Sequence, residues 1–301
     1  VGKGANSVAG NTVLGQAALD AVTNGHDNVA IGINALTNNT TGEKNVAVGS
    51  QASVLNTTGQ DNTAVGQAAL YNNTSGSTNT ALGRAALNVN TTGGSNVGIG
   101  YQALDANTSG NNSVAVGTYS LSAASTGSGN TAVGTYALNA NSTASNNTAV
   151  GNSALLQNTT GTNNVAVGAN AGDAITTGNY NTAIGKGSLS TATTASNNTA
   201  VGESALNADT TAGNNTAVGY HALISCTTGN QNTAVGSTAL DANTTGVYNS
   251  AFGYDTLGSN TTGQANTAIG YEALDTNTTG SNNVAVGQGS LDGNTTADHN
   301  T

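Results

Sequence analysis

The chain has 301 residues, including 42 Gly but no Pro, Met or Trp, and charged residues make up 6% of it, against roughly 25% in ordinary domains. This composition excludes a large aromatic core and leaves a thin core of small and β-branched side chains. The net charge of −10 argues against a nucleic-acid surface, because phosphate contacts need clustered basic residues, whereas Lys3, Lys44, Arg84 and Lys186 are scattered. One cysteine excludes an intrachain disulfide framework, and no apolar run reaches the roughly 18 residues of a membrane span.

Residues 1–11 are predicted to be an irregular lead-in. From Thr12 to Asn300 the chain consists of 17 copies of a 17-residue repeat, without insertion or deletion, and Thr301 begins an eighteenth copy. Positions within a copy are numbered 1 to 17 along the pattern T/V-A-V/I-G-x-x-A-L-x-x-N-T-T-G-x-x-N. A fixed period is typical of repeat proteins, in which each unit packs against its neighbours. We expect residues 12–301 to be one repeat region, part of a longer fibre.

Each copy predicts the same short elements in the same order. T-A-V-G, at positions 1 to 4, alternates β-branched with tiny residues and predicts a strand. The invariant Gly of position 4 permits a bend or a close backbone approach. A-L, at positions 7 and 8, predicts a second short strand, and N-T-T-G-x-x-N predicts a turn. Position 14 is Ala in four copies, so a positive φ is not expected to be obligatory there.

The expected fold is all-β, a parallel β-solenoid or β-roll of 17 coils of 17 residues each. Stacked strands lie about 4.7–4.9 Å apart, so 17 coils would extend roughly 80 Å. Val or Ile at position 3 and Leu at position 8 are expected to form apolar ribs inside the coils. Asn at position 17 is expected to form an amide ladder, each side chain bonding to the next coil.

Ala at position 2 should point to the opposite face of the strand from position 3. Because it is Ala in 15 of 17 copies, something must approach that face closely. We expect this to be another subunit, in a trimer or another oligomer. The alternative is a flat coil whose narrow interior is filled by Ala and Gly.

Charged residues test which columns face water. Of the 14 acidic residues, 13 lie in the variable columns, and the exception is Asp209 at position 11. Six share position 9, namely Asp20, Asp105, Asp173, Asp241, Asp275 and Asp292. That column would bind Ca²⁺ only where neighbouring coils both carry acids, which holds only for Asp275 and Asp292, so no metal site is expected.

The remaining reactive side chains give no catalytic pattern. His26, His221 and His299 lie in distant coils and are expected to be solvated, and Cys226 is expected to be a free thiol at the surface or in the turn. We expect no enzyme activity and no cofactor. Six tyrosines fall at position 5 or 6, namely Tyr101, Tyr119, Tyr136, Tyr220, Tyr254 and Tyr271. They would either line one face that binds sugars or proteins, or be scattered over the surface. We favour the scattered arrangement.

Asn at position 11 begins an N-x-S/T glycosylation pattern in 11 copies. A role in forming the turn explains these residues by itself, and a glycan-coated fibre is the alternative. The candidate acceptors are Asn39, Asn56, Asn73, Asn90, Asn107, Asn141, Asn158, Asn243, Asn260, Asn277 and Asn294.

The V-A-V-G-x-x-A/S-L pattern with a preceding Asn resembles the head repeats of the YadA-like trimeric autotransporter adhesins. The closest stretches are 96–100, 164–168 and 283–287, and the N-T-T-G turn makes each copy about three residues longer than in that family. The longer N-T-A-V-G-x-x-A-L-x-x-N-T-T-G pattern is also similar to repeats of phage-type tail-fibre proteins. The resemblance implies an elongated, trimeric, extracellular protein without catalytic residues in its repeats.

We therefore expect a structural or adhesive extracellular fibre, such as a tail-fibre shaft or the repeat region of a surface adhesin. Its expected location is the cell surface or a virion fibre. Its expected partners are further copies of the chain, as a homotrimer or a homopolymer, and a cell-surface or glycan receptor. The alternatives are a self-assembling, glycosylated extracellular filament and an ice-binding solenoid with a Thr array.

Overall fold

The computed structural model describes residues 8–301, so most of the predicted lead-in lies outside the described residues. The chain forms two compact units, which meet in sequence between Asn147 and Thr148. Each unit is a stack of coils, and coil 1 is the copy that begins at Thr12. The described residues contain strands, turns and bends but no helix.

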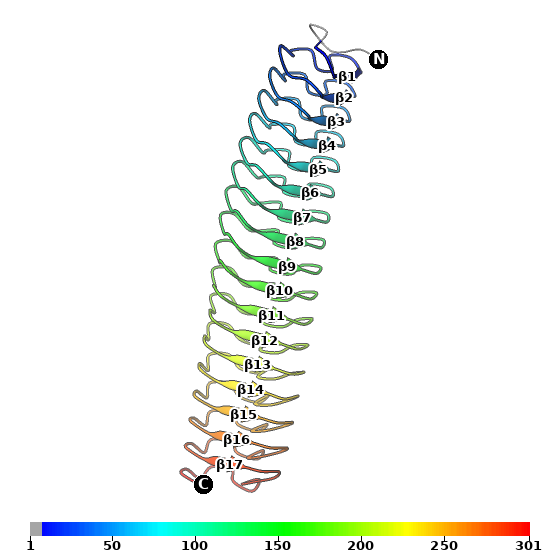
Figure 1. Ribbon diagram of the computed structural model, residues 1–301. Helices are drawn as coiled ribbons and strands as arrows, with labels where there is room; N and C mark the ends of the chain where they lie inside the picture. The colour runs from blue at the N-terminus through cyan, green and yellow to red at the C-terminus, as the bar shows by residue number, and fades with distance from the viewer. Residues whose placement is uncertain (1–7) are drawn as a thin grey trace. The chain divides into compact units, whose positions relative to one another are not determined.

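Each coil contributes one strand of three residues, from positions 1 to 3 (Figure 1). The first unit contains β1 (Thr12–Leu14), β2 (Val29–Ile31), β3 (Val46–Val48), β4 (Thr63–Val65), β5 (Thr80–Leu82), β6 (Val97–Ile99), β7 (Val114–Val116) and β8 (Thr131–Val133). The second contains β9 (Thr148–Val150), β10 (Val165–Val167), β11 (Thr182–Ile184), β12 (Thr199–Val201), β13 (Thr216–Val218), β14 (Thr233–Val235), β15 (Ser250–Phe252), β16 (Thr267–Ile269) and β17 (Val284–Val286).

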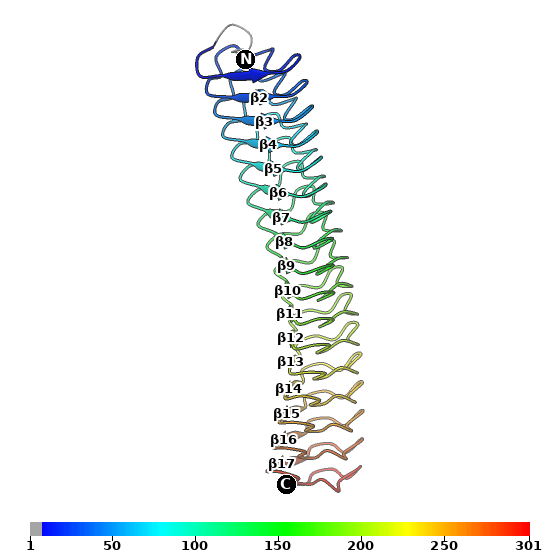
Figure 2. The ribbon, with the colours of Figure 1, turned by 90° about the vertical axis from the view of Figure 1, so that its right-hand side faces the viewer.

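Within each unit, every strand pairs in parallel with the next, at a register of one full repeat. Ala30 lies opposite Ala47 in the first unit, and Ala200 lies opposite Ala217 in the second. Figure 2 shows the strands above one another on one side of each unit and the turns on the other. The predicted parallel β-solenoid is confirmed.

The predicted second strand at positions 7 and 8 is wrong. These residues lie in a turn, and the Leu of position 8 has a left-handed backbone, as in Leu36 with φ +52° and Leu206 with φ +53°. Positions 6 and 16 of every described coil are also left-handed. Three such residues in each coil turn the chain sharply enough to close it in 17 residues, whereas extended backbone would need a longer repeat.

The interior contains positions 2, 7, 8, 11, 14 and 17. The Leu ribs of position 8 are confirmed, since Leu19, Leu104 and Leu206 are fully buried. The predicted ribs of position 3 are wrong, because the buried residue of every strand is its middle one, at position 2. Positions 1 and 3 point outward, which reverses the predicted faces of the strand.

The narrow coil explains why Ala occupies the inner face. A methyl group added to Gly98, the one glycine at position 2, would lie 3.1 Å from the carbonyl oxygen of Ala103 and 3.3 Å from Leu87 Cγ. A methyl fits this space tightly, and the one larger residue of the column, Val13, lies in the first coil. The structure therefore supports the narrow-interior alternative, and the Ala column does not face another subunit.

Two ladders of buried Asn side chains hold successive coils together. At position 17, Asn28 Oδ1 accepts from the backbone N–H of Asn45 at 2.9 Å, and Asn28 Nδ2 donates to the carbonyl of Gly42 at 2.9 Å. This ladder was predicted. At position 11 a second ladder, which the sequence did not reveal, joins Asn56 Nδ2 to Asn39 Oδ1 at 2.8 Å.

Candidate functional site

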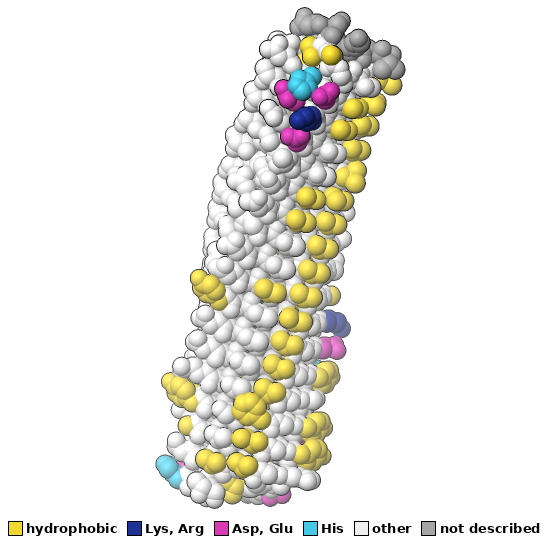
Figure 3. All heavy atoms as spheres, in the orientation of Figure 1, with side chains coloured by type: hydrophobic (Ala, Val, Ile, Leu, Met, Phe, Trp, Pro, Cys, Tyr) yellow, Lys and Arg dark blue, Asp and Glu magenta, His cyan; other side chains and the backbone are white. Residues whose placement is uncertain are grey.

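The outer face of the strands has a uniform chemical character from coil to coil. Position 1 is Thr, Val or Ser, and position 3 is Val, Ile, Leu or Phe. The position 3 side chains reach high exposure, with Leu14 at 55%, Ile269 at 43% and Val286 at 66%. Figure 3 shows apolar side chains recurring from coil to coil along this face. The face is called the outer strand face below.

In the first unit, tyrosines of neighbouring coils contact one another instead of standing alone. The Tyr101 and Tyr119 rings meet edge to face at a centroid distance of 5.2 Å, and Tyr119 stacks with Tyr136 at 5.4 Å. The guanidinium of Arg84 lies 5.5 Å from the centre of the Tyr101 ring. Variable positions 5 and 6 therefore form a continuous aromatic strip here, and the favoured interpretation of scattered tyrosines does not hold.

In the second unit, a similar strip lies among acidic residues. Tyr254 stacks with Tyr271 at 5.4 Å, and Tyr220 stacks on the ring of His221 at 3.7 Å. The column contains Asp255 and Glu272 at position 6. Burial and then the charge of Asp255 raise the pKa of Asp241, and burial followed by Asp255 and Glu272 raises that of Asp275.

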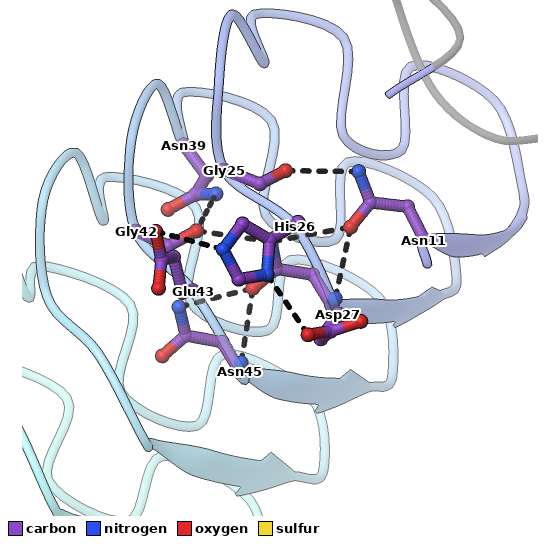
Figure 4. Close-up of polar contacts among 9 residues, drawn as sticks. Asn11, Gly25, His26, Asp27, Asn39, Gly42, Glu43 and Asn45 are labelled. Atoms are coloured by element: carbon purple, nitrogen blue, oxygen red, sulfur yellow. Dashed lines mark hydrogen bonds and ion pairs between the residues drawn. The ribbon is translucent and has the colours of Figure 1, made fainter. Parts of the chain in front are cut away.

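A small charged patch lies on the first coils, where Figure 3 shows basic, acidic and His side chains together. His26 Nδ1 contacts Asp27 Oδ2 at 2.8 Å, and its Nε2 contacts Glu43 Oε1 at 3.1 Å (Figure 4). Both carboxylates hold one imidazole ring whose side chain remains 44% exposed. Within the part of the chain that the structure describes, no three His, Cys, Asp or Glu side chains form a metal-binding group, and no pocket opens.

The glycosylation candidates lie inside the coils. Ten of the eleven, all except Asn294, are buried with at most 1% of their surface exposed, and they form the position 11 ladder. In Asn56 the acceptor nitrogen Nδ2 already donates to Asn39 Oδ1 and to the carbonyl of Gly59. A sugar on this nitrogen would need space that the interior does not have.

We therefore expect the folded chain to carry no N-glycan at these positions. After expression in a glycosylating eukaryotic host, peptide mapping should find the ten buried Asn residues unmodified, and endoglycosidase treatment should not change the mass of the peptides that carry them. Asn294, which is partly exposed in coil 17, serves as the internal comparison. A mass increment that maps to Asn56 or Asn73 would contradict the buried ladder.

The position 11 column changes character in the second unit, where Asp209 and Cys226 occupy neighbouring coils. Asp209 is fully buried, accepts from the Ala212 N–H at 2.8 Å and from Asn198 Nδ2 at 3.2 Å, and burial raises its pKa to about 7. Burial, followed by the charge of Asp209, raises the pKa of Cys226 to about 12. Cys226 does lie at the turn position, but its thiol is buried and un-ionised, so it is not a surface thiol.

Replacing Asp209 with Asn should remove a pH dependence of stability. The pKa of Asp209 is higher in the fold than its ordinary 3.8, so the fold gains stability from the bound proton below about pH 4 and loses it as the pH rises through 7. About 1.36 kcal/mol per unit gives up to about 4 kcal/mol between pH 4 and pH 8. Urea unfolding should show Asp209→Asn to be the more stable protein at pH 8 and nearly equal to the wild type at pH 4. Equal slopes against pH in both proteins would contradict this assignment.

The chain matches no protein-family profile and no curated protein sequence. No helix among residues 8–301 is long and apolar enough to cross a membrane. The function must therefore be inferred from the surface of the coils, namely the outer strand face, the two aromatic strips and the charged patch at His26.

Some of these features were accessible from the sequence and others were not. The shared column of the tyrosines was visible in the repeat, but their contacts depend on the coil spacing. The outward direction of position 3 was missed, and the signal that could have found it is the constant small size of position 2. Asp255 is at position 6, whereas its neighbours Asp241 and Asp275 are at position 9 of the preceding and the following coil. No spacing along the sequence indicates that these residues lie close together.

Proposed function

We propose that these coils are the repeat region of an extracellular structural or adhesive fibre, such as a tail-fibre shaft or a surface adhesin, which associates through the outer strand face. The observation that carries the proposal is the uncovered apolar face itself. Monomeric proteins rarely leave a contiguous apolar patch on the surface, and large patches mark contact sites. Within each unit, coils of the same design repeat this face at a constant register, so a second and a third copy can pack along it. The resemblance to YadA-like head repeats supports three copies.

The buried polar ladders support a mechanical role. Within each unit, the interior amides and backbone groups are used to join one coil to the next, as in Asn45 with Asn28 and Asn62 with Asn45. Most of the variable residues lie in outward columns. This arrangement keeps the stack constant while its surface changes, which suits a protein that works by length, rigidity and repeated display.

The native mass tests the association. Light scattering should give a particle of three chains of 29.0 kDa each, or a larger homopolymer. Val218→Asp combined with Val235→Asp places charges on the outer strand face of β13 and β14 and should yield monomers with unchanged circular dichroism. Thr228→Asp combined with Thr245→Asp adds the same charges to the exposed position 13 of the same coils and should leave the mass unchanged. A monomeric wild type at high concentration would overturn the proposal.

A second candidate function, ice binding, is favoured by one observation. Coils 11 to 16 carry an outward hydroxyl at position 1 beside an apolar residue at position 3, in strands that pair in register. The hydroxyls belong to Thr182, Thr199, Thr216, Thr233, Ser250 and Thr267. Such a regular array of hydroxyl and methyl groups can order water, although the T-x-T pattern is replaced by T-x-V. Thermal hysteresis by a monomer, lost in Thr216→Lys, would select this function, and no hysteresis would eliminate it.

A further inference from the structure

The acidic residues of the second unit have few cations to balance them. Residues 148–301 contain nine acidic residues and one basic residue, Lys186. Lys186 pairs with Glu203 at 3.7 Å, which is the only contact between Lys or Arg and a carboxylate among the described residues. The half-buried carboxylates of coils 14 to 16 therefore have no Lys or Arg of the described residues as a partner.

Two of these carboxylates converge on a glycine. A Cβ built on Gly258 would lie 2.4 Å from Asp255 Oδ1 and 2.9 Å from Asp275 Oδ1, so the two oxygens are close neighbours. Gly258 occupies position 9 of coil 15, between Asp241 and Asp275 in the same column. Because Gly258 has no side chain, the carboxylate oxygens can occupy the space beside it. Like charges this close repel one another, and a bound cation would relieve the repulsion.

Exposed aromatic rings adjoin this acidic group. Tyr254 and Tyr271, at position 5 of coils 15 and 16, stack on each other and are each about half exposed. Tyr220 occupies the same position in coil 13, while coil 14 has the small Ser237 there. The ring of Tyr254 thus has a stacking partner in the following coil but none of comparable size in the preceding coil.

The first unit shows what fits such a place. Arg84 and Tyr101 occupy position 5 of consecutive coils, and the guanidinium lies 5.5 Å from the ring centre. Ser237 and Tyr254 occupy the corresponding places in coils 14 and 15. The backbone register is the same, because Arg84 O accepts from Gln102 N at 3.1 Å and Ser237 O accepts from Asp255 N at 3.1 Å. At the position that Arg84 occupies beside Tyr101, the coil before Tyr254 carries Ser237, whose side chain is too short to cover the Tyr254 ring in the same way.

We propose that the surface formed by Tyr254, Asp255, Tyr271, Glu272 and Asp275 binds arginine side chains of a partner protein. One guanidinium stacks on the Tyr254 ring, in the place that Arg84 occupies beside Tyr101, and its N–H groups donate to the neighbouring carboxylates. Arg suits this surface better than Lys, because a planar guanidinium can stack on an aromatic face and present several donors to carboxylates. A neutral glycan could stack on the rings but would leave the carboxylates unbalanced. The proposal does not depend on the fibre function.

The sharpest test is a variant in which an arginine of the chain itself occupies the position beside the Tyr254 ring. The probe is a fluorescent peptide with four arginines separated by glycines, and its affinity is measured by anisotropy at low salt. Ser237→Arg should weaken binding by at least tenfold, because its own guanidinium would stack on Tyr254. Ser50→Arg makes the same substitution at position 5 of coil 3, with the same change of net charge, and should weaken binding by less than twofold. An equal effect of the two variants would show non-specific attraction and overturn the proposal.

Removing the carboxylates provides an independent test. Asp255→Asn with Asp275→Asn should weaken binding at least fivefold, whereas Asp27→Asn with Asp61→Asn, which removes the same charge elsewhere, should have little effect. Tyr254→Leu should also weaken binding, and circular dichroism would confirm that each variant is folded. The same peptide with citrulline in place of arginine keeps the shape without the charge and should not bind. Equal binding of the citrulline peptide, or stronger binding of a neutral oligosaccharide at the same residues, would overturn the proposal.

Discussion

Gly219→Ala is expected to destabilise the second unit by more than about 3 kcal/mol, because two costs coincide at this residue. Gly219 has φ +141°, a region that only glycine occupies readily, and an added Cβ would lie 2.2 Å from the carbonyl oxygen of Gly236 and 2.5 Å from its carbonyl carbon. Both backbones are fixed by the pairing of β13 with β14 and cannot separate locally. Thermal unfolding followed by circular dichroism would measure the loss.

Two other glycines separate the contributions. Gly287 also has a positive φ, +119°, but an added Cβ would meet nothing within 4 Å, so Gly287→Ala should show only the backbone cost of about 1–3 kcal/mol. Gly293 has neither a positive φ nor a neighbour within 4 Å, and Gly293→Ala should be nearly neutral. The expected order of damage is Gly219, Gly287, Gly293. If Gly219→Ala unfolded at the same temperature as Gly293→Ala, the close approach of the coils would be refuted.

Leu104→Asp is expected to cost more than about 5 kcal/mol and to melt several neighbouring coils of the first unit. Loss of a buried Leu side chain alone costs about 2–5 kcal/mol, and a carboxylate without a cation adds a large desolvation penalty. Leu104 is fully buried, and its backbone N–H donates to Ser120 O in the next coil at 3.0 Å, so the side chain cannot turn outward without breaking the stack. The loss should appear as a weaker β-sheet signal in circular dichroism and as faster cleavage by a protease.

Ser109→Asp is the matched control, because Ser109 lies in the same coil at the exposed position 13. It adds the same charge to the same coil, and we expect a change of less than about 0.5 kcal/mol, as for ordinary surface substitutions. Similar protease resistance in Leu104→Asp and Ser109→Asp would mean that position 8 does not form the core.

The repeat made much of the fold predictable. A column that varies little must contact something specific, so the Leu of position 8, the Gly of position 4 and the Asn of position 17 could be placed before the structure was known. The prediction that position 14 needs no positive φ is also confirmed, since neither Gly42 nor Ala144 has a positive φ. These predictions depend only on which side chains repeat, and not on the path of the backbone.

The predictions that failed depend on that path. Alternation along a strand places positions 2 and 3 on opposite faces, but it does not say which face is inside. Hydrophobicity favoured the larger Val or Ile, whereas the coil around Gly98 leaves room for little more than the methyl of Ala. The left-handed residues were equally hidden, because Leu36 gives no local signal for φ +52°. Only the frequent Asn at position 16 hinted at such a backbone.

The candidate surfaces were predictable to a smaller extent. The repeat placed Tyr254 and Tyr271 in one column, and their stacking follows from the spacing of parallel coils. Asp255 and Asp275, which both approach Gly258, are at position 6 of one coil and at position 9 of the next. It depends on how the turn between these positions directs each side chain, which the sequence of one coil does not determine.

The interrupted Asn ladder has a consequence for how the second unit would respond to tension. Successive coils are connected in series, so a pulling force along the stack is carried equally by every interface, and the least bonded one opens first. From Asn243 to Asn277 the position 11 amides join each coil to the next, as in Asn260 to Asn243 and Asn277 to Asn260. Between Ile175 and Cys226 this column contributes no amide ladder. We expect stretching to begin in this segment and the amide-linked coils to stay closed, so that the unit yields at a defined place and recovers from there when the load is released.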